Sequence, residues 1–419
     1  MKKDLVIIGG GPAGLAAAVA AYDAGVRDLV VIERESEAGG VLKQCIHNGF
    51  GLTRFKENMT GPEYAYKFLS EAKSRGIEIM TGTFVIGFAQ NKTVTCMNEK
   101  GIFEIQAKAV ILAMGCRERS RGALNIAGTR PAGVFSAGTA QKYVNMQGHL
   151  PGKRVVILGS GDIGLIMARR MTLEGAKVLC VLEIMPHSSG LRRNIAQCLD
   201  DFGIPLYLEH TILKIEGEER VTGITAVQVD KNKNPIPGTE KHFDCDTVLF
   251  SVGLIPENEL SKKAGLVLDP RTKGVTVDGN RETEAEGVFA CGNVLHVHDL
   301  VDFVSEEAEV AGRAAAEYIL KGKTHKNYIP TISGERVSYV LPQRLDKESN
   351  LPQKLYFRVK EAFRGAVVKV EAGAFVKTIK KIAVAPGEME YVVLTPEQIR
   401  SADSVKISVL KGEECDGNI

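Results

Sequence analysis

Two copies of one glycine pattern constrain the fold of this 419-residue chain more than any other feature. Each copy reads as an apolar strand, a glycine turn, a helix and a second apolar strand: "DLVIIGGGPAGLAAAVAAYDAGVRDLVVIE" and "RVVILGSGDIGLIMARRMTLEGAKVLCVLE". An acidic residue, Glu33 or Glu183, ends each second strand, 19 positions after the third glycine. This arrangement is typical of a dinucleotide-binding βαβ unit. The glycines are Gly9, Gly11 and Gly14 in the first copy and Gly159, Gly161 and Gly164 in the second.

Each position of the pattern has a chemical reason. The first glycine permits a tight turn, the second lets the backbone approach a pyrophosphate, and the third lets helix and strand pack closely. The helix N-terminus offers amide donors to the phosphates, and the acid can accept from both ribose hydroxyls. Glu183 would repel a 2′-phosphate, which favours NAD over NADP, although Arg192 and Arg193 follow a little further on. The alternative is a second copy that has the fold but binds nothing.

Further glycines mark the ends of later strands. "AVILAMGCRE" (109–118) predicts a strand ending at Gly115, and "EGVFACGNV" (286–294) predicts one ending at Gly292–Asn293. The second end suits the ribityl chain and pyrophosphate of a flavin. "DTVLFSVGLIPE" (246–257) contains Gly253, and helical periodicity begins near Val301.

Together these stretches resemble the two-dinucleotide-binding-domain flavoproteins, the superfamily of glutathione and thioredoxin reductases, over about residues 1–325. The resemblance implies an α/β fold of two Rossmann-like domains in which an NAD domain interrupts an FAD domain. The expected division is FAD on 1–117 and 254–328, NAD on 118–253, and a small C-terminal β-rich domain on 329–419. Met114 replaces the threonine and Asn293 the aspartate that the superfamily usually carries, and Asn can still hydrogen-bond a hydroxyl.

The resemblance also places the helix near Val301 with its N-terminus towards the flavin, where the charge of the reduced ring gathers. His296 and His298 are therefore expected close to the isoalloxazine, and the alternative for each is a loop histidine satisfied by backbone groups. The residues expected to bind the two cofactors are Gly9, Gly11, Pro12, Ala13, Gly14, Glu33, Arg34, Gly40, Val41, Ala113, Gly115, Gly159, Gly161, Asp162, Ile163, Gly164, Glu183, Gly253, Gly292, Asn293 and Val301.

A single cysteine stands near the first loop, in "GGVLKQCIHNGFG" (39–51). A dithiol reductase needs two thiols, and the eight cysteines form no CxxC or CxxxxC pair. Cys45 could still cycle through sulfenic acid, as in the NADH oxidases and peroxidases of this superfamily. The preferred interpretation is that Cys45 packs near the flavin beside Lys43 and His47. The other cysteines are expected to be reduced and mostly buried. The candidates for a catalytic role are Cys45, His47, His296 and His298.

Three longer strings resemble a narrower group: 39–68, 115–141 and 291–308. These are FAD/NAD oxidoreductases associated with glycerol-3-phosphate dehydrogenase-like flavoproteins and a small cysteine-rich protein. They are related more distantly to subunits of opine oxidase, proline dehydrogenase and hydrogen cyanide synthase complexes, and some related assemblies act as NADH oxidases. The resemblance implies a subunit that passes electrons between a partner's flavin and NAD. A self-sufficient NADH oxidase and a subunit that carries FAD only structurally are the alternatives.

The C-terminal 329–419 has short β-rich runs between Gly and Pro turns, with one helix start at Thr395–Pro396–Glu397. Its expected role is association with a partner or with a second copy, and its basic run "KTIKK" (377–381) is expected to be a solvated strand face.

The overall charge is nearly balanced, at 53 basic and 51 acidic residues, which gives no basis for nucleic-acid binding. No stretch of the sequence approaches a membrane span. The glycines in the N-terminal apolar run argue against a signal peptide, so a cytoplasmic protein is expected. The cysteine spacing predicts no metal site.

Overall fold

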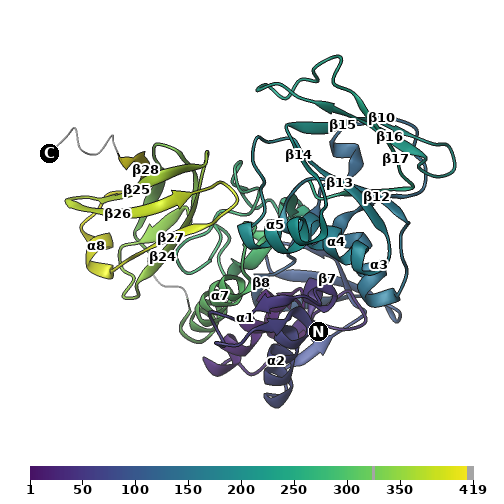
Figure 1. Ribbon diagram of the computed structural model, residues 1–419. Coiled ribbons are helices and arrows are strands. Elements are labelled where there is room, and N and C mark those ends of the chain that lie inside the picture. The colour runs from purple at the N-terminus through teal and green to yellow at the C-terminus, as the bar shows by residue number, and fades with distance from the viewer. Residues whose placement is uncertain (323–325, 413–419) are drawn as a thin grey trace. The chain divides into compact units, whose positions relative to one another are not determined.

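The computed structural model describes residues 1–322 and 326–412. The chain divides into two compact units, one of Met1–Cys116 with Pro256–Ile419 and the other of Arg117–Ile255 (Figure 1). The second unit is thus an insertion in the first. Each unit contains one of the two glycine loops.

The first unit is built on a seven-stranded sheet in the order β5-β2-β1-β8-β7-β6, with β20 also pairing with β8. The central strands are apolar because both faces of the sheet are covered. The C-terminal half of β8 pairs in parallel with β1 and β20, whereas its N-terminal half pairs antiparallel with β7. The strands are β1 (Lys2–Ile8), β2 (Leu29–Ile32), β5 (Glu78–Met80), β6 (Phe84–Phe88), β7 (Thr93–Asn98), β8 (Gly101–Leu112) and β20 (Val288–Ala290).

Two of the expected strand ends were wrong by a few residues. β8 stops at Leu112 rather than at Gly115, because Ala113 turns its carbonyl towards the first glycine loop. β20 stops at Ala290, and a short 3-10 turn over Gly292–Val294 follows it.

Helices α1 (Pro12–Asp23), α2 (Gly61–Ser74) and α7 (Val301–Lys321) cover one face of this sheet. α1 and α7 are alanine-rich where they meet, and this lets their backbones approach closely. A Cβ added to Gly312 of α7 would lie 2.3 Å from the carbonyl oxygen of Ala17 in α1. α7 begins at Val301, as the sequence predicts.

The second unit has a five-stranded parallel sheet in the order β11-β18-β12-β13-β14, and a four-stranded sheet, β10-β15-β16-β17. The strands of the parallel sheet are β11 (Val134–Ser136), β12 (Arg154–Leu158), β13 (Lys177–Glu183), β14 (Leu206–Leu208) and β18 (Thr247–Phe250). The other strands are β10 (Ala127–Gly128), β15 (His210–Glu216), β16 (Gly223–Gln228) and β17 (Lys241–Asp244), and the helices are α3 (Ala137–Gln147), α4 (Asp162–Leu173) and α5 (Arg192–Cys198).

The C-terminal part is β-rich, as predicted. It has one five-stranded sheet, β23-β21-β28-β25-β26, one three-stranded sheet, β22-β24-β27, and a shared apolar core. Thr395 and Gln398 form a capping box at the start of its helix, α8 (Pro396–Arg400). Most of the "KTIKK" side chains are exposed on β26. The strands are β21 (Tyr328–Ser333), β22 (Val337–Leu341), β23 (Arg344–Asp346), β24 (Gln353–Val359), β25 (Phe363–Ala372), β26 (Phe375–Val384), β27 (Glu390–Leu394) and β28 (Val405–Lys411).

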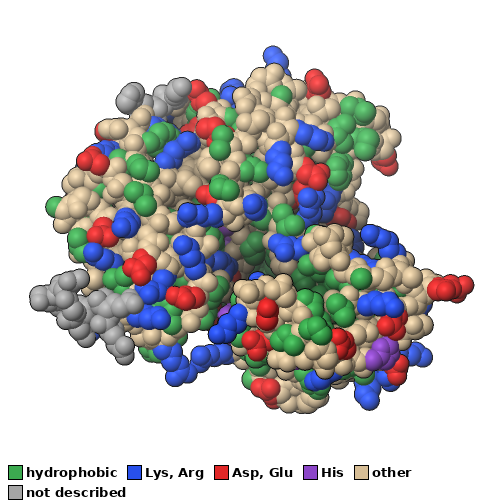
Figure 2. Space-filling view, turned by 90° about the horizontal axis from the view of Figure 1, so that it is seen from above, with side chains coloured by type: hydrophobic (Ala, Val, Ile, Leu, Met, Phe, Trp, Pro, Cys, Tyr) green, Lys and Arg blue, Asp and Glu red, His purple; other side chains and the backbone are tan. Residues whose placement is uncertain are grey.

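Short elements complete the chain: β3 (Asn48–Phe50), β4 (Met59–Thr60), β9 (Cys116–Glu118), β19 (Leu254–Pro256) and α6 (Glu259–Lys263). Among the residues described, no helix combines the length and the apolar character needed to cross a bilayer. Acidic and basic side chains are interspersed on the face of the molecule that Figure 2 shows.

Candidate functional site

The first glycine loop joins β1 to α1, and its geometry requires glycine at two positions. Gly9 has φ +111°, and a Cβ there would lie 2.4 Å from the carbonyl oxygen of Ala113. A Cβ on Gly14 would lie 1.8 Å from the carbonyl oxygen of Gly9. Any side chain at either position would push the helix away from the strand ends. The loop therefore packs in close backbone contact with β1, α1 and the end of β8.

The second glycine loop repeats this construction between β12 and α4. Gly159 has φ +100°, and a Cβ there would lie 2.0 Å from the carbonyl oxygen of Ser251, just after β18. A Cβ on Gly164 would lie 2.5 Å from the carbonyl oxygen of Gly159. Ser251 thus takes the place that Ala113 has in the first unit. The two sequence copies fold into the same local structure.

The two acids also match. Glu33 accepts hydrogen bonds from the amides of Gly10, at 2.9 Å, and Glu35, at 2.9 Å. Glu183 accepts from the amides of Ser160, at 3.0 Å, and Met185, at 3.0 Å. Each carboxylate is fixed beside its glycine loop and has acceptor capacity for a ribose hydroxyl. For Glu183 that capacity is on Oε1, because Oε2 also accepts from the hydroxyls of Ser160 and Ser189.

The middle glycine of each loop faces open space. A Cβ on Gly11 would find no atom closer than 3.9 Å, and one on Gly161 none closer than 3.6 Å. These two glycines are the N-caps of α1 and α4, and neither helix has a side-chain cap. Helix starts of this kind leave amide donors for an anion. Both loops therefore fit a dinucleotide pyrophosphate.

The other residues expected to contact cofactors lie around these loops. The 3-10 turn Gly40–Gln44 is held against the first loop, because the amide of Gly39 donates to the carbonyl of Gly10 at 2.8 Å. A Cβ on Gly40 would lie 2.9 Å from the Cα of Gly11. Gly115 and Gly253 have positive φ and open space where a Cβ would be. The remaining predicted contacts are Pro12, Ala13, Arg34, Val41, Asp162, Ile163 and Val301, in the loops, at the strand ends or in the first turns of helices.

Cys45 follows the Gly40–Gln44 turn, and its thiol donates to the carbonyl of Val41 at 3.3 Å. The residue is partly exposed, but burial of the thiol raises its pKa to about 12. The thiolate, which is the reactive form, is therefore disfavoured at neutral pH. Of the other cysteines, those at 96, 180, 198, 245 and 291 are buried and Cys116 is partly exposed, while Cys415 lies outside the described residues.

The segment after Cys45 is held by a residue that was not predicted from the sequence. Asp302, in the first turn of α7, accepts from the amides of Gly51, Thr53 and Arg54 at 3.1, 2.7 and 3.2 Å. His47 lies in the same segment, with its ring 5.0 Å from that of Phe50. An acid in the first turn of a predicted helix was the available signal, but only the tertiary structure shows what it binds.

The turn after β20 is also fixed by close packing and hydrogen bonds. A Cβ on Gly292 would lie 2.8 Å from the Cβ of Ala13, so this turn packs against the start of α1. The side-chain oxygen of Asn293 accepts from the amide of His298 at 3.0 Å. The side-chain amide of Asn258 donates to the carbonyl of Val294 at 2.8 Å.

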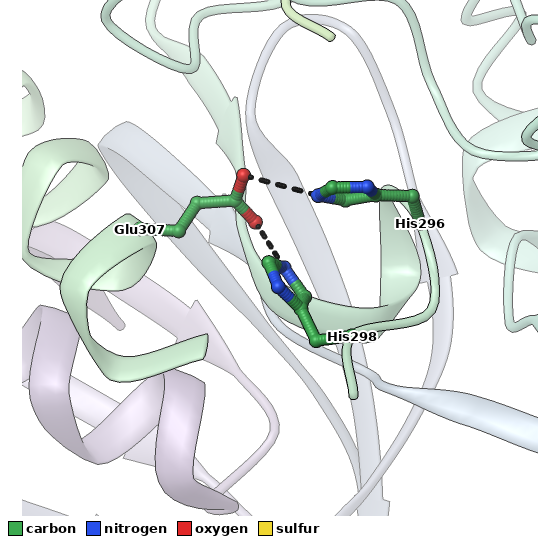
Figure 3. A group of neighbouring side chains, drawn as sticks. All are labelled: His296, His298 and Glu307. Carbon is green, nitrogen blue, oxygen red and sulfur yellow. Dashed lines mark hydrogen bonds and ion pairs between the residues drawn. The ribbon is translucent and has the colours of Figure 1, made fainter. Parts of the chain in front are cut away.

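His296 and His298 do not face an open site. Both side chains point towards Glu307 of α7 (Figure 3). Both are almost completely covered by protein atoms. His298 Nε2 lies 3.1 Å from Oε2 of Glu307, and His296 Nε2 lies 3.5 Å from Oε1. The expectation that these rings lie close to the isoalloxazine stays a prediction, since the structure shows only their contacts with protein groups. The alternative of backbone partners is wrong, since the partner is a buried carboxylate.

Glu307 is completely buried, and Arg281 neutralises its charge through a hydrogen bond of 3.0 Å from Nε to Oε1. The amide of Gly292 donates to Oε2 at 2.9 Å. Burial alone would raise the pKa of Glu307, but its interactions with His298 and Arg281 hold that pKa well below the usual range. Burial lowers the pKa of His296 to about 4, so His296 is neutral at neutral pH.

The carboxylate of Glu307 thus joins the Gly292 turn to the histidine loop. Neither Glu307 nor Arg281 was predicted as a site residue. Nothing in the sequence pairs an acid in the second turn of a helix with an arginine 26 positions earlier.

Comparisons with known proteins agree with this architecture. A family model described as pyridine nucleotide-disulphide oxidoreductase matches residues 3–315. An opine oxidase subunit from Agrobacterium tumefaciens is 25% identical over 75% of this chain, and an NADH oxidase from Methanocaldococcus jannaschii is 28% identical over 72%. The matched region spans 64% of each of these relatives. The thioredoxin reductase of T. acidophilum aligns with a TM-score of 0.63 and 25% identity, over 75% of this chain and 98% of that one.

Proposed function

The chain belongs to the pyridine nucleotide-disulphide oxidoreductase family, and on that premise we propose that it transfers hydride between NADH and FAD. Family members bind FAD and NAD(P)H, and this chain is an NAD(P)H-dependent flavoprotein of that kind. We assign FAD to the first loop, in residues 1–117 and 254–328, and NAD to the second, in residues 118–253.

One observation carries the proposal: the two glycine loops share the same backbone contacts and the same amide-bound acid. The bound flavin would accept and release a hydride at its ring. The residues around it need only bind and orient the cofactors, since this step requires no side-chain acid or base. Glu183, which ends β13, favours NAD because its charge would meet a 2′-phosphate.

Electrons gained from NADH must then leave the chain, and we propose that a partner protein takes or supplies them. One of the relatives is, by its name, one subunit of an opine oxidase. The narrower resemblance in the sequence suggests a glycerol-3-phosphate dehydrogenase-like flavoprotein and a small cysteine-rich protein as partners. The second candidate function is a self-sufficient NADH oxidase, and the similarity to the M. jannaschii NADH oxidase favours it.

An anaerobic titration of the FAD-loaded chain with NADH, followed by flavin absorbance, tests the proposal. Full bleaching at one NADH per FAD is expected, with NADPH much less effective. No bleaching would contradict hydride transfer and leave a structural role for FAD. Admission of air then separates the two candidates, since rapid turnover with oxygen indicates an oxidase and slow reoxidation indicates a partner.

A further inference from the structure

The buried cluster of His296, His298 and Glu307 has one feature that its role as a packing element does not explain. A carboxylate oxygen only accepts hydrogen bonds, so His298 must donate from Nε2 to Oε2 of Glu307. A neutral ring with its hydrogen on Nε2 presents a bare lone pair at Nδ1. That Nδ1 atom is buried and has no hydrogen-bond partner within the described chain.

The charges around the cluster cancel. Arg281 pairs with Glu307, and both side chains are almost fully buried, at 3% and 0% exposure. On the C-terminal side, Arg358 of β24 forms an ion pair with Asp299, and Tyr339 of β22 lies 3.1 Å from Nδ1 of His296. The other groups that face the cluster are Tyr356 of β24 and Cys291 after β20. Two fixed positive charges thus balance two fixed negative ones.

The cluster does not have the features of a metal site, although its three ligand types could suit one. Both oxygens of Glu307 already accept hydrogen bonds, from Arg281 and from the amide of Gly292. A divalent cation would lie beside the guanidinium of Arg281, and that repulsion has no compensation among the described neighbours. A proton on a ring nitrogen needs no displacement of these bonds.

The cluster is also directly bonded to the turn where we place the flavin. Glu307 accepts a hydrogen bond from the amide of Gly292, and the backbone amide of His298 donates to the side-chain oxygen of Asn293. A charge on the flavin would be felt by a ring nearby in the protein interior. At an effective dielectric constant of about 20, a unit charge about 10 Å away changes the proton affinity of an imidazole about tenfold.

We propose that Nδ1 of His298 is a proton-binding site whose occupancy follows the redox state of the flavin bound beside Gly292 and Asn293. A hydride from NAD(P)H brings two electrons and one proton, so it adds one negative charge to the flavin. His298 takes up one further proton from solvent at Nδ1, forming an N–H bond and an imidazolium beside Glu307. The proton returns to solvent when the two electrons leave. His298 then offsets the negative charge of the reduced flavin without contacting the reacting atoms. This inference rests on the proposed flavin site.

Histidine ring ¹⁵N NMR of the full FAD-loaded chain tests the proposal. Spectra are compared between the oxidised protein and protein reduced anaerobically by light with a deazaflavin and EDTA as electron donor. The His298→Gln variant assigns the signals. We expect the protonated fraction of the His298 ring to rise on reduction. The midpoint potential should also fall more steeply with pH in the wild type than in His298→Gln, by up to about 30 mV per pH unit, the limit for one full proton per two electrons.

A Tyr339→Phe variant is the matched control, because it removes the hydroxyl beside His296 and leaves the contacts of His298 in place. It should keep the proton uptake. An unchanged His298 ring on reduction, a ring already protonated in the oxidised protein, or one tightly bound metal ion per chain would each overturn the inference. Photochemical reduction keeps the two proposals apart: a flavin that light reduces but NADH does not would contradict only the proposed function.

Discussion

At the scale of single residues, the buried carboxylate of Glu307 offers a test of stability. Glu307→Gln leaves the guanidinium of Arg281 buried without its charge partner, which typically costs about 3–5 kcal/mol. Glu306→Gln is the control, because the side chain of Glu306 is 48% exposed and pairs with an exposed member contribute about 0–1 kcal/mol. Urea unfolding measures both variants, and equal losses would contradict the buried ion pair.

The low pKa of Glu307 also fixes the sign of a pH effect. A carboxyl group whose folded pKa is depressed stabilises the protein above its unfolded pKa, near 4.5, and loses that contribution as the pH falls through the folded value. The wild type should therefore lose stability more steeply below pH 4.5 than Glu307→Gln does. Unfolding curves at several acidic pH values measure this, and parallel losses would contradict an ionised Glu307.

Cys45 provides a chemical test at the same scale. Because burial raises its pKa to about 12, the thiol should react with iodoacetamide far more slowly at pH 7 than a small-molecule thiol does. Mass spectrometry of the intact folded chain follows the modification, with unfolded protein as the reference for full reactivity. Rapid alkylation of Cys45 at pH 7 would revive its candidacy as a redox centre.

At the scale of elements, the start of α7 organises the segment that follows Cys45. Asp302→Ala removes the acceptor for three backbone amides at 51, 53 and 54, and each lost charge-assisted bond costs about 1–3 kcal/mol locally. Faster amide hydrogen exchange confined to that segment is expected. Asp302→Asn should have an intermediate effect, since it keeps one carbonyl oxygen. Unchanged exchange in both variants would show that other contacts hold the segment.

Both glycine loops were predictable from the sequence at the same scale, because their steric requirements are local. Gly9 and Gly159 each turn the chain within a few residues, and β2 and α7 begin where the pattern places them. The inward orientation of His296 and His298 was not predictable, because it depends on Glu307 and Arg281, which other elements supply. The three amides around Asp302 are likewise 248 to 251 positions away in the sequence.

At the scale of the whole molecule, the chain inserts one glycine-loop unit into another, and we assign one cofactor to each. The C-terminal β-rich part was expected from its turns. The contacts of this part with the histidine loop, made by Tyr339 and Arg358, were not expected from the sequence. They depend on how the folded chain places β22 and β24 beside that loop.

The assignment of the two cofactors is tested most directly by the FAD content and the NADH dissociation constant of two matched variants, Glu33→Gln and Glu183→Gln. Both acids are buried, each accepts one amide hydrogen bond on each oxygen, and each substitution preserves shape. Glu183 differs in also accepting from the hydroxyls of Ser160 and Ser189. We expect Glu33→Gln to lose FAD. Glu183→Gln should keep FAD and bind NADH about tenfold more weakly, the loss of one good hydrogen bond to a charged group. Loss of FAD in Glu183→Gln with normal retention in Glu33→Gln would contradict the assignment of the two loops.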